Sequence, residues 1–311
     1  MIRSICLNPA VDRFYHIDNF IHGGQYKNNT PHIAAGGKGI NVARVIAGCH
    51  EEVEVRGIIG GPNGEFIREE MEKCGCRSDW ISVPENTRVT INIIDNAQRK
   101  ESEIVEAGFT APENLTETFL GRLRNDIREN DIIICSGLSL PGIRDDIYRR
   151  ISGICAGAGA FCFLDTNGGV LSSSIGGSYR FAKPNINELL SLYGEPAYRD
   201  EYQLAELGRR IRESGIDQLM ISMGSKGALL LSRDGTYKAA VPVVKVEKTI
   251  GCGDSAVAGY AIALSQGKNT EEALRFSMAC AVANSMSREL TSLNTSLINE
   301  LIPQIQIKEF S

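Results

Sequence analysis

Short apolar runs that suit strands alternate with segments of helical periodicity along most of this chain. The segment Pro112–Asn130 is typical of the helices, since Leu115, Phe119, Leu123 and Ile127 recur four residues apart on one face. Further helices are expected over Asn63–Lys73, Ile143–Ala156, Asn187–Tyr193, Gln203–Glu213, Asp254–Ser265, Thr270–Arg288 and Asn294–Ile302. Strands are expected over Ile2–Leu7, Val53–Ile59, Asp131–Cys135, Ala160–Leu164, Tyr179–Ala182, Gln218–Ser222, Ala228–Leu231 and Val243–Glu247. Apolar strands alternating with helices predict an α/β fold with a mainly parallel sheet covered on both faces.

Four early segments alternate apolar with polar residues, as strands with one solvated face do. They are Asp12–Asp18, Ile81–Val83, Val89–Asp95 and Glu101–Val105. We expect them to form a small separate sheet, inserted into the fold and drawn from about residues 12–32 and 87–106. Because no repeat or low-complexity linker divides the chain, residues 1–311 are expected to form one domain.

Composition and charge narrow the class of protein. Hydrophobic residues make up 42% of the chain and charged residues 23%, as in ordinary globular proteins. The net charge of −5 disfavours nucleic acid as a partner. No apolar run approaches the roughly 20 residues that a membrane span needs, so we expect no membrane partner. Nine scattered cysteines, without zinc-like spacing, suggest reduced thiols in a cytoplasmic protein.

The stretch TIGCGDSAVAG, residues 249–259, carries the strongest chemical signal. Its glycines allow a tight turn, and a small-residue helix then begins with its unpaired N–H groups pointing at the turn. Such a turn suits an anion, phosphate in particular. The carboxylate of Asp254 would repel that anion. Its presence in an anion site is explained if it takes a proton from an attacking hydroxyl. The plainer alternative is that Asp254 only caps the helix.

A second glycine-rich loop opens a helix in AAGGKGINVARVIAG, residues 34–48, with Lys38 in the first helical turn. It is not a Walker A loop, because His32 stands where the first glycine belongs and Gly39 where Ser or Thr belongs. A loop of this kind can still bind phosphate or a sugar. Alternatively, Lys38 is a solvated lysine at the start of a helix.

Polar residues follow most of the predicted apolar strands. In a parallel sheet these positions meet at one edge, where ligands bind. Each residue alone is more often a turn residue or a cap, and their joint placement is what predicts a site. They are Asn8, Asp12, Ser136, Asp165, Lys183, Asn185, Glu188, Ser222, Gly224, Gly227 and Asp254.

Together these motifs resemble the PfkB-type, ribokinase-like family of sugar kinases, and more narrowly its branch of 1-phosphofructokinases and tagatose-6-phosphate kinases. The resemblance runs nearly end to end. It rests on LNPAVDR (7–13), AGGKGINVAR (35–44), Thr87-Arg88, Ser136-Gly137, KPNINE (183–188), SMGSKGA (222–228) and TIGCGDSAVAG (249–259). It implies a ribokinase-like three-layer α/β sandwich, with a central, mostly parallel sheet and a small β-sheet lid.

The resemblance also implies an activity. It implies ATP-dependent phosphorylation of a hydroxyl of a phosphorylated ketohexose, such as fructose 1-phosphate or tagatose 6-phosphate. Asp254 would be the general base, and the backbone N–H groups of Gly251, Cys252 and Gly253 would hold charge on the transferred group. The cofactors implied are ATP and Mg²⁺, and the partners are the sugar phosphate and a second subunit that forms a homodimer through the lid.

The family's binding residues map onto matching positions of this sequence. Asn185 and Glu188 would organise the metal. The ATP-binding residues would be Lys183, Asn185, Ser222, Gly224 and Gly227. The substrate-binding residues would be Asp12, Gly36, Gly37, Lys38, Asn41, Arg88 and Ser136, with Lys38 and Arg88 on the phosphate.

Two other functions remain open from the sequence. One is a kinase of the same fold that acts on an unphosphorylated sugar or nucleoside. The other is a regulator that binds nucleotide or sugar phosphate without turnover. The lid segment ESEIVEAGF, residues 101–109, lacks the branch's usual asparagine and proline-glycine, and therefore leaves the identity of the sugar open.

Overall fold

A large mixed sheet forms the centre of the computed structural model, which describes residues 1–27, 29–98, 100–287 and 294–310. Within these residues the large sheet has ten strands, ordered β14-β13-β12-β11-β10-β9-β8-β1-β4-β5. Pairing is parallel from β5 to β11 and antiparallel from β11 to β14. The strands are β1 (Ile2–Cys6), β4 (Val53–Gly60), β5 (Arg77–Val83), β8 (Ile132–Ser136), β9 (Phe161–Asp165), β10 (Tyr179–Ala182), β11 (Ile216–Ser222), β12 (Ala228–Leu231), β13 (Thr236–Ala240) and β14 (Gln306–Glu309).

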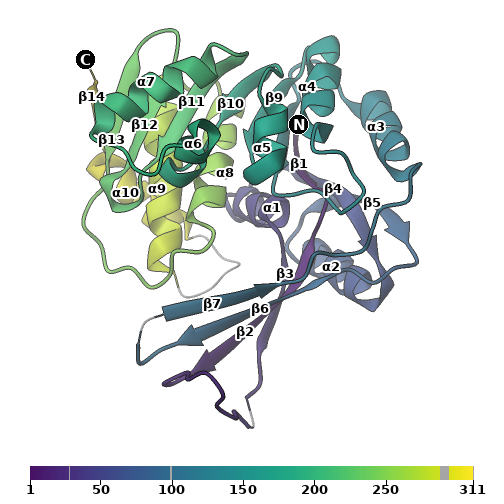
Figure 1. Ribbon diagram of the computed structural model, residues 1–311. Helices are drawn as coiled ribbons and strands as arrows, with labels where there is room; N and C mark the ends of the chain where they lie inside the picture. The colour runs from purple at the N-terminus through teal and green to yellow at the C-terminus, as the bar shows by residue number, and fades with distance from the viewer. Residues whose placement is uncertain (28, 99, 288–293, 311) are drawn as a thin grey trace.

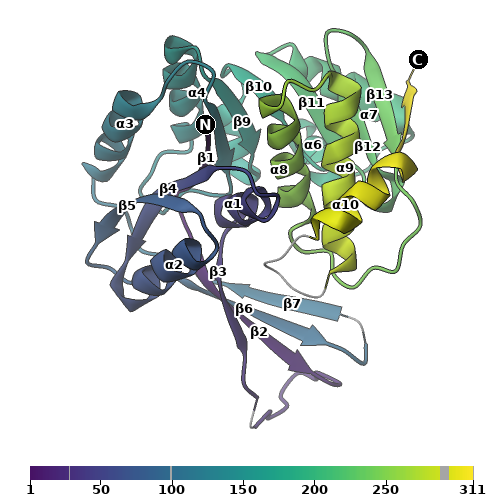
Figure 2. The same cartoon turned by 180° about the vertical axis from the view of Figure 1, so that it is seen from behind.

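Helices cover both faces of the large sheet (Figures 1 and 2). One face carries α3 (Leu115–Asp126), α4 (Ile147–Ala158), α5 (Gly168–Ser174), α6 (Ile186–Tyr193) and α7 (Glu201–Arg212). The other carries α1 (Lys38–Gly48), α2 (Gly61–Lys73), α8 (Cys252–Ser265), α9 (Thr270–Met286) and α10 (Thr295–Leu301). Short 3₁₀ turns, η1 (Gly224–Lys226) and η2 (Ile302–Gln304), complete the elements.

Each face of the large sheet has its own apolar core, because side chains alternate along every strand. On the α8 face, Phe163 and Phe181 pack with Tyr260, and the Phe181 and Tyr260 rings stack 4.1 Å apart. Each such buried aromatic or aliphatic side chain contributes on the order of 1.5–3 kcal/mol. This packing fixes α8, and therefore Asp254 in its first turn, against the sheet.

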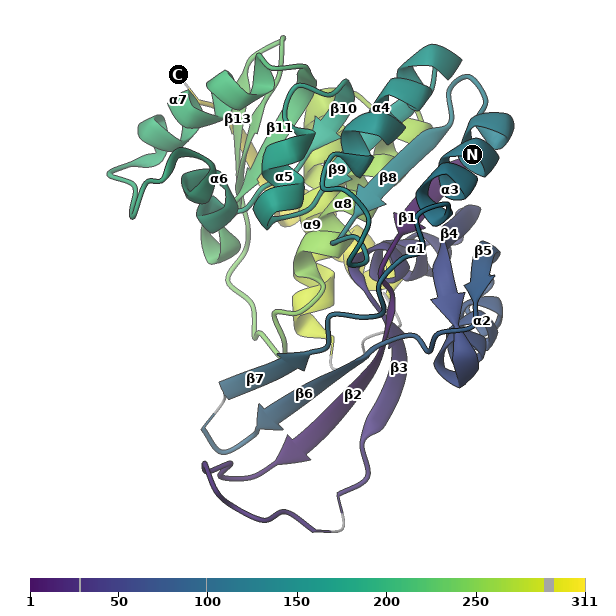
Figure 3. The same ribbon diagram turned by 45° about the vertical axis from the view of Figure 1, so that its right-hand side comes forward.

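A small sheet projects from the end of the large one (Figure 3). Among the described residues it has four strands, ordered β3-β2-β6-β7. They are β2 (Ala10–Ile17), β3 (His32–Gly36), β6 (Val89–Asp95) and β7 (Lys100–Val105). Strand β7 is exposed along its whole length, and among the described residues it pairs with β6 alone. The expected α/β fold with a mostly parallel sheet and a smaller separate sheet is confirmed.

Two of the expected strands are placed differently in the structure. Ile81–Val83 was expected in the small sheet, but it ends β5, which pairs in parallel with β4 at the edge of the large sheet. Trp80 and Ile81 are buried on opposite faces of β5, one in each apolar core, and this burial outweighs the local alternation that suggested a solvated strand.

The expected strand Val243–Glu247 is wrong, and the segment runs as an exposed loop in which Val243 is 103% exposed. The strand that follows β12 is instead β13, which pairs with β12 and β14.

Other differences are shifts of boundaries. Helix α3 is shorter than Pro112–Asn130. Ala34–Gly36, expected in a loop, ends β3. Helix α9 ends at Met286, and the expected end at Arg288 lies outside the described residues. No helix in the described ranges is long and apolar enough to cross a membrane.

Candidate active site

A cleft of about 720 Å³ lies between the carboxyl ends of the parallel strands and the small sheet. Loops after β10 and β11 and the first turns of α1 and α8 form its floor, and β2, β6 and β7 form its wall. Residues from the whole chain therefore meet in one place. Its lining is Asp12, Gly37, Lys38, Asn41, Arg88, Thr90, Asn92, Glu101, Glu103, Val105, Lys183, Asn185, Glu188, Ser222, Gly224, Ile250, Gly251, Gly253 and Asp254.

Asp254 lies in the first turn of α8, facing the cleft from its floor. Gly251 is the N-cap and has a φ of 80°, a left-handed conformation that few residues other than glycine adopt. The carboxylate of Asp254 does not cap the helix, and instead accepts a hydrogen bond of 2.8 Å from Nδ2 of Asn41 on α1. Burial raises the pKa of Asp254 to about 6, although Lys38 draws it down. A carboxylate of this kind can exchange a proton near neutral pH.

Asp165 at the end of β9 holds two lysines that line the cleft. Its side chain is 0% exposed, and its oxygens lie 3.2 Å from Nζ of Lys183 and 3.6 Å from Nζ of Lys38. Burial alone would raise the pKa of Asp165, but the two ammonium groups hold it below its ordinary value. Burial would likewise lower the pKa of Lys38, yet the Asp165 and Asp254 carboxylates raise it. Lys38 therefore stays cationic at the floor of the cleft.

The small sheet supplies polar side chains to the opposite wall. Asp12, Thr90 and Glu103 lie on one face of neighbouring strands, because Asp12 pairs with Thr90 in the register of β2 and β6. Burial raises the pKa of Asp12 to about 6, and the Glu103 carboxylate adds to the shift, while Arg88 opposes it. A Cβ on Gly36 would lie 1.9 Å from Oδ2 of Asp12, so the absence of a side chain at Gly36 makes room for that carboxylate.

Arg88 stands where the chain enters β6, and its guanidinium is held mostly by backbone. Nε and Nη2 donate to the carbonyl of Asn8, at 3.3 and 3.1 Å. Nη1 donates to Oγ1 of Thr90 and to the carbonyl of Glu106. These bonds use four of the five N–H donors and fix the plane of the guanidinium at the cleft.

Asn185 and Glu188 form the capping box of α6, beside the two lysines. Oδ1 of Asn185 accepts from the backbone N–H of Glu188 at 2.9 Å, and Oε2 of Glu188 accepts from that of Asn185 at 2.8 Å. Asn185 is therefore a cap that orients Glu188. Glu188 lines the cleft, and one or two carboxylates suffice for Mg²⁺ when substrate phosphates and water complete the shell. No cluster of three acidic, His or Cys side chains in the described ranges makes a metal cage.

Four of the residues expected in the site do not line the cleft. Gly36 lies behind Asp12. Gly227 packs against β13, since a Cβ on Gly227 would lie 1.9 Å from the carbonyl oxygen of Ala239. Ser136 is 1% exposed at the end of β8. The Cys252 side chain turns away toward Asn284, whose Nδ2 lies 3.4 Å from the sulfur.

Sequence reasoning left Asp165 out of the site, although it had marked it as a strand-end residue. It also missed Thr90, Asn92, Glu101 and Glu103 of the wall, which line the cleft. Alternation in the small sheet is a signal that could have found these four, because it puts them on the same face as Asp12.

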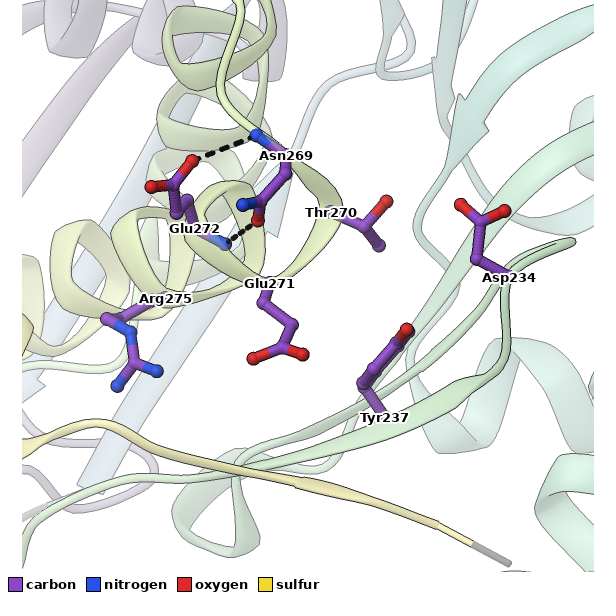
Figure 4. A pocket seen from close by; sticks show the side chains of 7 residues that line it. All are labelled: Asp234, Tyr237, Asn269, Thr270, Glu271, Glu272 and Arg275. Carbon is purple, nitrogen blue, oxygen red and sulfur yellow. Dashed lines mark hydrogen bonds between the residues drawn. The ribbon is translucent and has the colours of Figure 1, made fainter.

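A second, smaller hollow of about 330 Å³ lies between β13 and the start of α9 (Figure 4). Its central pair, Asn269 and Glu272, is bonded in a capping box, as the dashed lines in Figure 4 show. These two side chains thus cap the start of α9, and none of the expected site residues lines the hollow.

Comparison with known proteins identifies the family and the fold. The family model described as pfkB family carbohydrate kinase matches residues 6–295. A tagatose-6-phosphate kinase of Staphylococcus epidermidis is 30% identical over 311 residues, covering 99% of this chain and 100% of the relative. A 1-phosphofructokinase of Bacillus subtilis is 29% identical over 307 residues, covering 99% of both. The solved structure of phosphofructokinase-2 from Escherichia coli with substrates and products has the same fold, with a TM-score of 0.90 at 24% identity, over 97% of this chain and 98% of that one. The chain belongs to the pfkB family of carbohydrate kinases.

Proposed function

We propose that this kinase transfers the γ-phosphoryl group of ATP to a hydroxyl of a phosphorylated ketohexose, with Asp254 as the general base. The observation that carries the proposal is the buried Asp254 carboxylate, with a pKa of about 6, at the start of a helix beside two lysines. The relatives named tagatose-6-phosphate kinase and 1-phosphofructokinase support a phosphorylated acceptor.

In the reaction, the acceptor oxygen bonds to the γ-phosphorus while its proton passes to Asp254. The bond between the γ-phosphorus and the bridging oxygen breaks, and ADP leaves with that oxygen. Backbone N–H groups of Gly251 and Gly253 and the helix dipole of α8 stabilise the charge on the transferred group. Lys183 adds a cation at this point, since its Nζ lies 3.1 Å from where a Cβ of Gly253 would be.

The nucleotide would lie along the β10 and β11 end of the cleft. Ser222 and Gly224 line that end, and the isolated bridge between Asn185 and Ser222 holds the two loops together. When bound, Mg²⁺ supplies charge neutralisation for the phosphates. Glu188 is the residue that would hold it, directly or through water, with Asn185 fixing its orientation.

The sugar would lie between Asp12 and Asn41, which both line the cleft, and Asn41 bonds to Asp254. A carboxylate and an amide suit the hydroxyls of a sugar. Lys38 and Arg88 would take the phosphate already on the sugar, and one Arg88 N–H has no acceptor within the described part of the chain. Nine cysteines without a disulfide fit a reduced compartment, and we place the reaction in the cytoplasm.

The acceptor can be identified by measuring ADP release with Mg-ATP. The panel is fructose 1-phosphate, tagatose 6-phosphate, fructose 6-phosphate, fructose, tagatose and adenosine. We expect turnover with one phosphorylated ketose, and we expect Arg88→Ala to raise its KM by about 10- to 100-fold, the value of a charge-assisted hydrogen bond. Arg88→Lys keeps the charge without the two-pronged fork and should recover part of that loss.

Two outcomes would contradict the proposal. Turnover only with an unphosphorylated compound, unchanged in Arg88→Ala, would make the chain a kinase of free sugars or nucleosides. Binding of ATP and sugar phosphate without ADP release would make it a regulator.

We propose that the small sheet of β2, β3, β6 and β7 acts as a lid that excludes water, and that two lids pair in a homodimer. The face turned away from the cleft supports pairing, because alternation places four isoleucines there and Ile33 and Ile104 are 42% and 58% exposed. The four are Ile33, Ile91, Ile93 and Ile104.

Ile104→Asp is expected to convert the dimer to a monomer, because it buries a charge in the apolar interface. Sedimentation velocity of this variant and of Tyr202→Ser, an equally exposed apolar position far from the lid, provides the comparison. A wild-type protein that sediments as a monomer at micromolar concentration would refute the dimer.

A further inference from the structure

The chain passes four times between the large sheet and the small one, and all four passages meet at Asn8. Asn8 itself links β1 to β2. Its carbonyl accepts from Arg88, which opens β6, and lies 3.8 Å from where a Cβ of Gly37 would be, at the junction of β3 and α1. Its side chain contacts the fourth passage at Ala107 and Gly108, after β7. One residue therefore touches every covalent link of the lid.

The Asn8 side chain joins that fourth passage to the body of the protein. Nδ2 donates to the carbonyl of Ala107 at 3.0 Å and, at 3.4 Å, to the carbonyl of Ser139 in the loop after β8. The first bond holds the end of the lid, and the second holds a loop of the large sheet. Only a side chain with two N–H donors on one nitrogen can bridge two carbonyls in this way.

The other end of the Asn8 amide is unusual. Oδ1 is buried, and no donor in the described part of the chain bonds to it. It lies against Gly108, whose Cβ, if present, would be 2.9 Å away. Leaving a buried acceptor unpaired is costly, so the contacts made by Nδ2 and by the Asn8 carbonyl must hold the amide in place.

We propose that Asn8 is a positioning residue for the phosphate-binding group Arg88, acting as a clasp that fixes Arg88 and the end of β7 to the large sheet. This inference rests on the proposed function for the role given to Arg88. The Asn8 carbonyl takes two of the N–H donors of Arg88 and sets where the guanidinium points. The side-chain amide of Asn8 fixes the segment after β7 to the large sheet. The same residue therefore positions both Arg88 and the lid.

The test compares Asn8→Ala and Asn8→Asp with the wild type. Alanine removes both donor bonds of the side chain but keeps the backbone carbonyl, so it acts on Arg88 through the end of β7, where the Glu106 carbonyl accepts from Nη1 of Arg88. Aspartate puts a carboxylate against two carbonyl oxygens. We expect the KM for the phosphorylated ketose to rise about 10-fold or more, since small displacements of a binding group have effects of this size. The KM for ATP should stay within about 2-fold, because the nucleotide end of the cleft is built by other loops. Asn114→Asp, an exposed change at the start of α3, is the matched control.

A double-mutant cycle separates positioning from mere stability. In an Arg88→Ala background, Asn8→Ala should cause no further rise in the KM of the sugar phosphate. An equal rise in both backgrounds, or equal rises in the KM for ATP and for the sugar, would overturn the proposal.

A measurement without turnover keeps the two proposals distinct. Amide hydrogen exchange in β6 and β7 should be faster in Asn8→Ala than in wild type or Asn114→Asp, whichever acceptor the enzyme uses. Unchanged exchange would refute the clasp, even if the proposed substrate is correct. Faster exchange in an enzyme that uses only free sugars would support the clasp and refute the phosphate role of Arg88.

Discussion

Replacing Asp254 by asparagine is expected to lower kcat by about 10²- to 10⁴-fold, the contribution of a positioned general base. The amide keeps the size of the side chain and can still accept the hydrogen bond from Asn41, but it cannot take the proton of the acceptor hydroxyl. ATP and the sugar phosphate should bind with little change, since removing a carboxylate from an anion site does not weaken it. Steady-state kinetics together with equilibrium binding of both substrates measure the two effects.

The pH dependence provides a second readout of the same group. The carboxylate must be ionised to act, so kcat/KM should rise with pH through about 6, the pKa of Asp254, and then level off. That acidic limb should be missing from the residual activity of Asp254→Asn.

The contribution of Asp254 to folding stability should fall as pH rises, whereas kcat/KM should increase. A folded-state pKa above the ordinary value of 3.8 means that the contribution of Asp254 to stability is present below pH 3.8 and is lost as pH rises through about 6. Asp254→Asn should therefore be at least as stable as wild type at pH 7. A kcat within 5-fold of wild type would refute the role of base, and a marked loss of stability would indicate a structural carboxylate instead.

The residues that sequence reasoning could find are those with a local signal. Gly251, Asp254 and Lys38 lie at junctions between a turn and a helix, where glycines and the first helical residues predict an anion site without knowledge of the rest of the fold. The order of strands and helices was predictable for the same reason, since periodicity depends on near neighbours.

What could not be predicted depends on contacts between distant segments. Ile81–Val83 looks like a solvated strand until β5 is seen to pair with β4. Val243–Glu247 has the composition of a strand, yet no strand of the described chain pairs with it, because β13 and β14 complete that edge of the sheet. Asp165 gains its role only when Lys38, from α1, and Lys183, after β10, are brought to its two oxygens. No spacing in the sequence predicts that these three charged side chains meet.

Asp165→Asn is therefore the strongest test of the arrangement that the sequence does not show. Removing one partner of a buried ion pair typically costs about 3–5 kcal/mol, because the remaining charge loses its compensation. The pair of Asp165 with Lys183 is buried, whereas Lys38 is 32% exposed. Here two ammonium groups, one of them on a 4% exposed side chain, would face each other without the carboxylate. We expect the free energy of unfolding at pH 7 to fall by about that amount, as measured by urea titration. The KM for ATP should rise as well, because the lysines would move apart.

Asp217 offers a matched control, since it also bridges two cations, Arg180 at 3.4 Å and Arg233 at 3.0 Å, but is 37% exposed. Water already screens that group, so Asp217→Asn should cost no more than about 1 kcal/mol. The pKa of Asp165 is held below its ordinary value, so its contribution is present above that value and is lost as pH falls through the folded pKa. The difference in stability between wild type and Asp165→Asn should therefore shrink in acid. Two results would show that Asp165 does not hold the two lysines electrostatically: a difference in stability that is the same at pH 7 and in strong acid, or a loss no larger than that of Asp217→Asn.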